Sequence, residues 1–168
     1  NIIFATGIHR PVTQAEKESI LTPFIAQRIK TLAHEPRDIT RIVRLGETSG
    51  GIPVELNRAL FDHDHVILIG GVSFHYFAGF TGGRKLACPG LASSKTISQT
   101  HKLAFDCEAR SRRDGVDTGL LQGNAVHEAF MEAASYANPA FCITTLVNDE
   151  GEAADLFCGN WRTSHQAA

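Results

Sequence analysis

The sequence lacks the features that mark several classes of protein. No apolar run approaches the roughly 20 residues that a membrane-spanning helix needs, and no repeat, low-complexity tract or long linker divides the chain. The charge is nearly balanced, with 16 lysine and arginine residues against 18 aspartate and glutamate residues. This balance gives no electrostatic reason to expect nucleic acid or an anionic membrane surface as a partner.

Cysteine is sparse and widely spaced, and no two cysteines form a CxxC pair. A short, cysteine-dense chain would indicate a disulfide-stabilised secreted protein, and this sequence does not fit that description. We therefore expect reduced thiols and a cytoplasmic location. The four cysteines are Cys88, Cys107, Cys142 and Cys158.

The rest of the sequence is typical of a soluble α/β protein. Hydrophobic residues make up 43% of the 168 positions, enough for one domain with a substantial core. Strand patterns at 1–6, 39–46, 65–72 and 140–149 alternate with helix patterns, and the strand at 65–72 is apolar on both faces. This alternation predicts a mainly parallel sheet flanked by helices, with 65–72 as a central strand.

Helix signals separate the expected strands. Thr13 followed by Glu16 fits a capping box and predicts a helix start, and Pro23 should kink or restart that helix. Residues 93–105 and 124–137 are expected to form two further helices.

Two loops that leave strand ends carry reactive side chains. Ligands of α/β sheets bind beyond the carboxyl ends of the strands, and residues 6–11 (TGIHRP) and 73–85 (SFHYFAGFTGGRK) follow two expected strands. This arrangement allows His9, His75 and Lys85 to converge. Histidine titrates near neutrality and suits acid–base catalysis, and a desolvated lysine amine is a nucleophile.

The glycine-rich part of the second loop suits a bound ligand. Gly82 and Gly83 let the backbone approach a ligand closely, and Arg84 offers positive charge to a phosphate or carboxylate. The loop matches neither a Walker A motif nor a GxGxxG turn. The residues alone support two histidines as acid and base, with a lysine and a glycine loop for an anion or a covalent cofactor. They leave open whether a proton or a hydride is transferred.

Each of these residues also has an ordinary structural explanation. His9 could fill a turn, His75 could be a satisfied core histidine, and the glycine turn could carry solvated basic residues. His101, alone on an expected helix, would be assigned to the surface or the core. The remaining histidines have no spacing typical of a zinc site: His34, His63, His65, His127 and His165.

Taken together, the motifs resemble the nickel-pincer lactate racemase family. The resemblance rests on residues 6–11 (TGIHRP), on residues 75–85 (HYFAGFTGGRK) followed by Pro89 and Gly90, and on His101, sixteen residues after the lysine. It runs through the whole chain.

The resemblance implies a reaction and a cofactor. Members of this family are racemases or epimerases of 2-hydroxy acids such as lactate. They work by reversible hydride transfer to a nickel-pincer nucleotide, a pyridinium-3-thioamide-5-thiocarboxylic acid mononucleotide that holds nickel. The resemblance implies that Lys85 tethers this cofactor through the thioamide and so contributes to nickel binding, and that His101 is the remaining nickel ligand. His9 and His75 would alternate as general base and acid.

It also implies roles for the rest of the loop and for missing parts of the chain. Gly79, Gly82 and Gly83 would leave room for a flat cofactor, and Arg84 would be an anion partner. The family's chain is more than twice as long, so we expect residues 1–168 to be a single, partial N-terminal catalytic domain of a two-domain α/β protein. A preceding segment and a second domain would be absent.

Partners and competing functions follow from the same reasoning. Cofactor loading requires dedicated synthesis enzymes, so we expect a recombinant fragment to lack the cofactor and to be inactive. Two other functions stay open: a non-catalytic nucleotide- or phosphate-binding domain of the same fold, and a Schiff-base enzyme that uses the amine of Lys85.

Overall fold

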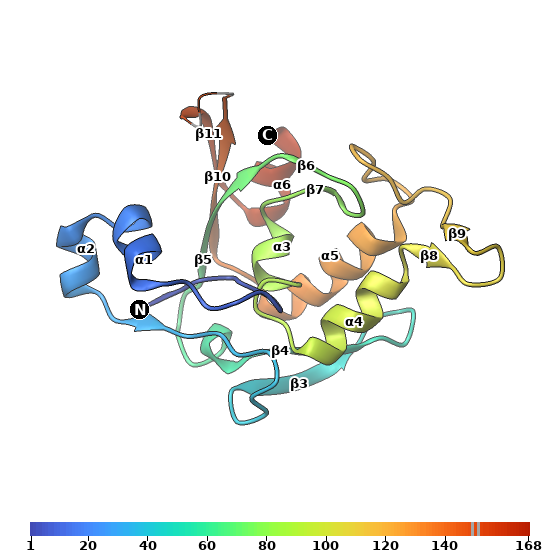
Figure 1. Cartoon of the computed structure of the whole chain (residues 1–168), viewed down its shortest axis with the longest axis horizontal. Helices are drawn as coiled ribbons and strands as arrows, with labels where there is room; N and C mark the ends of the chain where they lie inside the picture. The colour runs from blue at the N-terminus through green and yellow to red at the C-terminus, as the bar shows by residue number, and fades with distance from the viewer. Residues whose placement is uncertain (149, 151) are drawn as a thin grey trace.

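Helices and strands alternate along the chain in the computed structural model, which describes residues 1–148, 150 and 152–168 (Figure 1). The helices are α1 (Gln14–Ile20), α2 (Pro23–Arg28), α3 (Arg84–Ala87), α4 (Ser94–Lys102), α5 (Ala125–Ala137) and α6 (Trp161–Ala167), with a 3-10 turn, η1 (Arg58–Leu60). The strands are β1 (Ile2–Ile3), β2 (Thr31–Leu32), β3 (Ile42–Glu47), β4 (Pro53–Asn57), β5 (Ile67–Val72), β6 (Phe74–His75), β7 (Gly79–Phe80), β8 (Phe105–Asp106), β9 (Ser111–Arg112), β10 (Phe141–Val147) and β11 (Ala153–Gly159).

The α/β class is confirmed, and the strand pairing is mixed. Among the described residues, β1–β2 and β5–β10 are parallel, whereas β3–β4, β6–β7, β8–β9 and β10–β11 are antiparallel. The strands thus form several small sheets rather than one mainly parallel sheet. The strand expected at 140–149 is β10, and residue 149 lies outside the described part of the chain.

Strand β5 occupies a different place from the one predicted. It forms an edge of the three-stranded sheet β11-β10-β5, and β10 is the central strand. Its side chains alternate between buried Leu68 and Val72 on one face and Ile67 and Ile69, 58% and 65% exposed, on the other. The prediction of a central strand was wrong because an apolar sequence on both faces does not show whether both faces are covered.

The covered face of this sheet packs against three helices. Leu68 of β5 and Cys142 of β10 lie in one cluster with Ala87 of α3, Ala134 of α5 and Trp161 of α6. Figure 1 shows α3 and α6 beside β5 and β10, with α5 next to α3 on the side away from β5. Buried apolar area of this kind is the main favourable contribution to folding. The sheet therefore fixes the place of α3, which carries the lysine of the glycine-rich loop.

The first two helices follow the sequence signals. The Thr13 side chain accepts a hydrogen bond from the backbone N–H of Glu16, and the Glu16 carboxylate accepts one from the backbone N–H of Thr13, so the capping box is confirmed. Helix α1 ends at Ile20, and Pro23 begins α2 as its first residue. Proline is favoured there because its missing N–H would have no partner in the helix.

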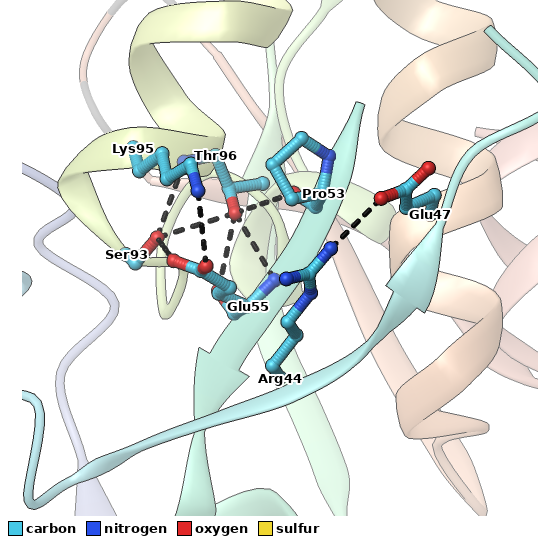
Figure 2. A network of polar contacts seen from close by, with 7 residues as sticks. All are labelled: Arg44, Glu47, Pro53, Glu55, Ser93, Lys95 and Thr96. Carbon is cyan, nitrogen blue, oxygen red and sulfur yellow. Dashed lines mark hydrogen bonds and ion pairs between the residues drawn. The ribbon is translucent and has the colours of Figure 1, made fainter. Parts of the chain in front are cut away.

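Helix α4 is anchored at its start by a polar network with β4, which Figure 2 shows from close by. The Ser93 hydroxyl caps the helix and donates to Glu55 at 2.7 Å, and the Thr96 hydroxyl donates to the Pro53 carbonyl at 2.8 Å. Ser93 and Thr96 are both buried, so these bonds satisfy groups that water cannot reach. They fix the direction of α4 and hence the position of His101 near its other end.

Helix α5, which the sequence predicts at 124–137, presents Val126, Phe130, Ala133 and Ala134 to the core, and all four are fully buried. None of the helices in the described residues is long and apolar enough to cross a membrane.

The cap of α5 also holds the loop that carries the candidate site. The Asn124 side chain accepts hydrogen bonds from the N–H groups of Val126 and His127, and its Nδ2 donates to the carbonyls of Phe77, at 2.8 Å, and Leu120, at 3.0 Å. Asn124 is fully buried. One side chain therefore ties the start of α5 to residue 77.

We expect Asn124→Ala to lower the free energy of unfolding by about 2–3 kcal/mol, because it removes a helix cap and leaves buried backbone groups without partners. Asn160→Ala is the matched control, since exposed Asn160 caps α6 through a single bond to the N–H of Arg162. It should cost about 1 kcal/mol or less. Urea denaturation measures both values, and equal losses would contradict the double role of Asn124.

Candidate active site

The loop from residue 73 to residue 85 folds back onto the end of β5 as a small hairpin. Strands β6 and β7 pair with His75 opposite Gly79. The Thr81 hydroxyl donates to the Gly71 carbonyl at 3.0 Å, and the N–H of Ser73 donates to that hydroxyl at 2.8 Å. These bonds close the hairpin and place both of its ends beside the carboxyl end of β5.

His75 is held by the backbone of its own turn. Its Nδ1 lies 3.1 Å from the N–H groups of both Phe77 and Ala78, which can only donate. Nδ1 is therefore the unprotonated nitrogen, and neutral His75 carries its proton on Nε2. The Tyr76 ring stacks on the imidazole with ring centroids 4.8 Å apart. Burial, followed by the charges of Lys85 and His101, lowers the pKa of His75 to about 4.

His101 has the opposite tautomer. Its Nδ1 lies 2.7 Å from the carbonyl oxygen of Ile97, one turn earlier in α4, and a carbonyl can only accept. Nδ1 is therefore protonated, and Nε2 keeps a free lone pair. Burial lowers the pKa of His101, the Ile97 bond partly offsets this, and the charges of Lys85 and His9 lower it further. His101 thus suits a role as a neutral ligand.

Lys85 lies in α3, the short helix after the glycine pair, and is partly buried. Burial lowers the pKa of its amine to about 8, and the charge of Arg84 adds to this effect. A larger fraction of the amine is consequently neutral near pH 7 than for a lysine in water. A neutral, partly desolvated amine can attack a carbonyl or an activated acyl group.

The loop of residues 6–11, which carries His9, contacts the segment that follows α3. The N–H of Gly7 donates to the carbonyl of Gly90 at 2.8 Å, and the N–H of His9 donates back to Thr6 at 3.0 Å. Gly7 also lies against Ile97 of α4, one turn before His101. This docking brings the loop of residues 6–11 to the face of α4 on which His101 lies. His9 itself is exposed.

An open groove of about 400 Å³ extends from His9 along the start of α1, lined also by Arg10, Val12, Glu16 and Ile20. Arg10 donates to both carboxylate oxygens of Glu16, at 2.6 and 2.9 Å. Its guanidinium is therefore paired within the chain.

The three glycines expected to make room for a cofactor are all buried against protein atoms. A Cβ at Gly79 would collide with the Leu120 carbonyl, one at Gly82 would lie 2.9 Å from Val72, and one at Gly83 would lie 2.9 Å from His165. Gly82 and Gly83 have φ values of +75° and +49°, which glycine adopts without strain. Glycine is thus required here for close packing of the loop.

Arg84 lies behind the loop, away from solvent. It is fully buried, and its Nη2 donates to the carbonyls of Ala78 at 2.7 Å and Phe80 at 2.9 Å. Burial lowers its pKa to about 10, so it stays charged at neutral pH. This position favours a structural role for Arg84 over binding of an anion in the site.

His75 lies close enough to Lys85 and His101 for their charges to lower its pKa, and Lys85 and His9 act on His101 in the same way, so the four residues come together from four different elements. The Phe77 ring links two of them, since its centroid lies 6.4 Å from those of both His75 and His101. Among the described residues, no group of three or more histidine, cysteine, aspartate or glutamate side chains is placed to hold a metal ion.

His165, which the sequence left among the histidines without a role, is buried against this loop. Its Nε2 lies 2.7 Å from Arg84 Nη1. No local pattern near position 165 indicates this contact, because its partner is 81 residues away along the chain.

Comparisons with known proteins agree with the motif positions. A family model described as the lactate racemase N-terminal domain matches residues 1–112, which include all four converging residues. The lactate racemase of Lactiplantibacillus plantarum is 32% identical over 165 residues, covering 98% of this chain and 38% of that protein. The lactate racemase of Thermoanaerobacterium thermosaccharolyticum is 28% identical over 164 residues, covering 98% of this chain and 37% of that protein.

Solved structures show the same relationship. The lactate racemase apoprotein from T. thermosaccharolyticum superposes with a TM-score of 0.91 at 27% identity, covering 99% of this chain and 39% of that one. A Thermotoga maritima protein superposes with a TM-score of 0.72 at 20% identity, covering 98% of this chain and 43% of that one, and this likeness concerns the fold alone. The chain therefore spans less than half the length of these relatives.

The opposite tautomers of His75 and His101 can be measured directly. In ¹⁵N-histidine NMR spectra of the protein at pH 7.5, we expect His75 to show an unprotonated Nδ1 and a protonated Nε2, and His101 to show the reverse. Solvent-exposed His65 serves as the reference for a histidine outside the site. Finding the same tautomer at both positions would contradict the assignment.

Proposed function

The chain belongs to the lactate racemase N-terminal domain family, and we propose that it forms the catalytic part of a 2-hydroxy-acid racemase or epimerase with a lactate-like substrate. The observation that carries the proposal is that His9, His75, Lys85 and His101 lie close together, where they would supply two acid–base histidines, a nucleophilic lysine and a histidine with a free lone pair. A stereochemical inversion needs groups that act on both faces of the substrate carbon, and His9 and His75 come from separate loops.

The residues present fit the nickel-pincer nucleotide that the family resemblance implies. Lys85 would form the covalent attachment, because burial lowers the pKa of its amine to about 8. His101 would bind nickel through Nε2, the nitrogen left free by the bond between Nδ1 and the Ile97 carbonyl; neutral imidazole is a good ligand for nickel. When bound, this cofactor supplies a hydride acceptor for the substrate α-carbon.

The proton steps fall to His9 and His75, which are not equivalent in this structure. With Nδ1 held by two backbone N–H groups, neutral His75 offers an N–H at Nε2 and stabilises the substrate oxygen as a donor. His9 is then the group that takes the hydroxyl proton. For the opposite enantiomer, His75 must itself accept a proton at Nε2, which requires the hydrogen bonds at Nδ1 to rearrange.

A lysine with a lowered pKa is also suited to Schiff-base chemistry, so an enzyme of that class is the second candidate. A non-catalytic nucleotide- or phosphate-binding domain is the third. The cytoplasmic location and the dependence on cofactor-synthesis enzymes stay predictions from the sequence and the family resemblance.

Intact-protein mass spectrometry of the full-length protein, produced in a host with the cofactor pathway, tests the proposal. We expect a cofactor-sized adduct on Lys85 together with stoichiometric nickel. An unmodified Lys85 under these conditions would contradict the proposal, and trapping of a keto substrate on Lys85 by borohydride would support the Schiff-base alternative instead.

Site variants separate the roles of the histidines. His9→Ala and His75→Ala should each lower kcat by about 100-fold or more, the usual contribution of general acid–base catalysis, with nickel still bound. His101→Ala should lose nickel and keep the adduct on Lys85. His65→Ala, at an exposed histidine outside the site, is the control and should behave as wild type. Near-normal turnover of His9→Ala or His75→Ala would exclude that residue as acid or base.

A further inference from the structure

Helix α6 lies directly behind the glycine-rich loop. It begins at a cap formed by Asn160 and packs against β10 and β11, and Figure 1 shows it beside β6 and β7. His165, near its end, is 7% exposed. Its Cβ and ring lie so close to Gly83 that a Cβ on that glycine would approach within 2.9 Å. The imidazole therefore touches the loop at the residue before Arg84.

The same imidazole is a hydrogen-bond partner of the buried guanidinium. Arg84 Nη1 lies 2.7 Å from His165 Nε2 and 3.4 Å from the Thr81 carbonyl. Arginine carries its proton throughout the pH range of proteins and can only donate. The same Nε2 also lies 2.7 Å from the Thr81 carbonyl oxygen, which can only accept. One neutral nitrogen cannot accept from Arg84 and donate to Thr81 at once, so the tautomer decides which of the two bonds forms. Burial, followed by the charge of Arg84, lowers the pKa of His165, and the contact with Thr81 partly offsets this, which favours the neutral imidazole.

The pair continues to the catalytic histidine through the backbone of one residue, Ala78. Arg84 Nη2 donates to the carbonyl of Ala78, and the N–H of the same Ala78 donates to Nδ1 of His75. His75 also pairs with Gly79 across the hairpin. A chain of contacts thus runs from His165 through Arg84 and Ala78 to His75, and Lys85 follows Arg84 directly in sequence.

We propose that His165 is a positioning residue of the active site: it holds the Arg84 guanidinium, which fixes the loop between His75 and Lys85. In the part of the chain that the structure describes, no carboxylate pairs with Arg84. A buried charge is tolerated only when it is well hydrogen-bonded. Loss of the imidazole would remove the nitrogen that lies 2.7 Å from both Arg84 Nη1 and the Thr81 carbonyl, and the loop would move to satisfy the group left without a partner.

The expected effect of His165 on turnover rests on the proposed function. Its expected effect on the order of the loop rests on the contacts of His165 alone. The test therefore uses two variants of the full-length protein. His165→Leu keeps the bulk near Gly83 and removes the polar nitrogen. His165→Gln keeps a polar amide, which can accept from Arg84 or donate to Thr81, at about the position of Nε2. Ser164→Ala is the control on the same helix, since the buried Ser164 hydroxyl has no partner among the described residues.

The first readout does not involve the cofactor. In ¹⁵N-histidine NMR, His165→Leu should disturb the Nδ1 signal of His75, and hydrogen exchange of residues 74–86 should increase at least about 10-fold, because the loop loses its anchor. His165→Gln and Ser164→Ala should leave both unchanged. If His165→Leu shows the same histidine spectra and the same exchange rates as the wild type, the proposal is overturned, whether or not the protein is a racemase.

The second readout is catalytic. In the loaded enzyme, His165→Leu should lower kcat by about 10- to 100-fold, the cost of a misplacement of about 1 Å, with little change in KM, and His165→Gln should recover most of the loss. If the loss of kcat in His165→Leu is in proportion to its drop in Tm, and His165→Gln does not recover it, His165 is a purely structural residue and the proposal is overturned. Absence of a Lys85 adduct in the wild type would instead count against the proposed function alone.

Discussion

The guanidinium of Arg84 carries a permanent charge in a place that water does not reach, and the arrangement of the site follows from how that charge is satisfied. Its Nη groups donate to the carbonyls of Ala78, Phe80 and Thr81, and Nη1 lies 2.7 Å from His165. Because these carbonyls come from the turn and the returning strand of the hairpin, the backbone of residues 78–81 has to fold around the side chain. Gly83 allows the close approach that this needs. The ends of the hairpin, and with them His75 and Lys85, are thereby fixed.

The backbone then determines which proton each histidine carries. The turn after His75 offers two N–H groups to Nδ1, whereas α4 offers the Ile97 carbonyl to Nδ1 of His101. One imidazole becomes a donor at Nε2, and the other becomes a ligand at Nε2. Two identical side chains thus acquire different chemistry from local hydrogen bonds, and this difference is consistent with a proton-handling role for the first and a metal-binding role for the second.

Local sequence signals predicted much of this structure. The capping box at Thr13, the new helix at Pro23 and the helix expected at 124–137 depend on residues a few positions apart, and all three are confirmed. The place of β5 at a sheet edge depends on distant strands, and the burial of Arg84 depends on His165, 81 residues later. A basic residue beside a glycine pair gives the same sequence pattern whether it faces a ligand or the core. The motif therefore predicts candidate site residues, whereas long-range packing determines the position of each.

The central claim is that the loop closed around Arg84 prepares the neighbouring amine of Lys85 for covalent attachment. The pH dependence of Lys85 acylation by acetic anhydride, followed by peptide mass spectrometry with exposed Lys102 as reference, tests it most directly. The account predicts that Lys85 titrates with a pKa of about 8, lowered by burial and by Arg84 from the usual 10.5. A Lys85 that titrates near 10.5 would contradict it.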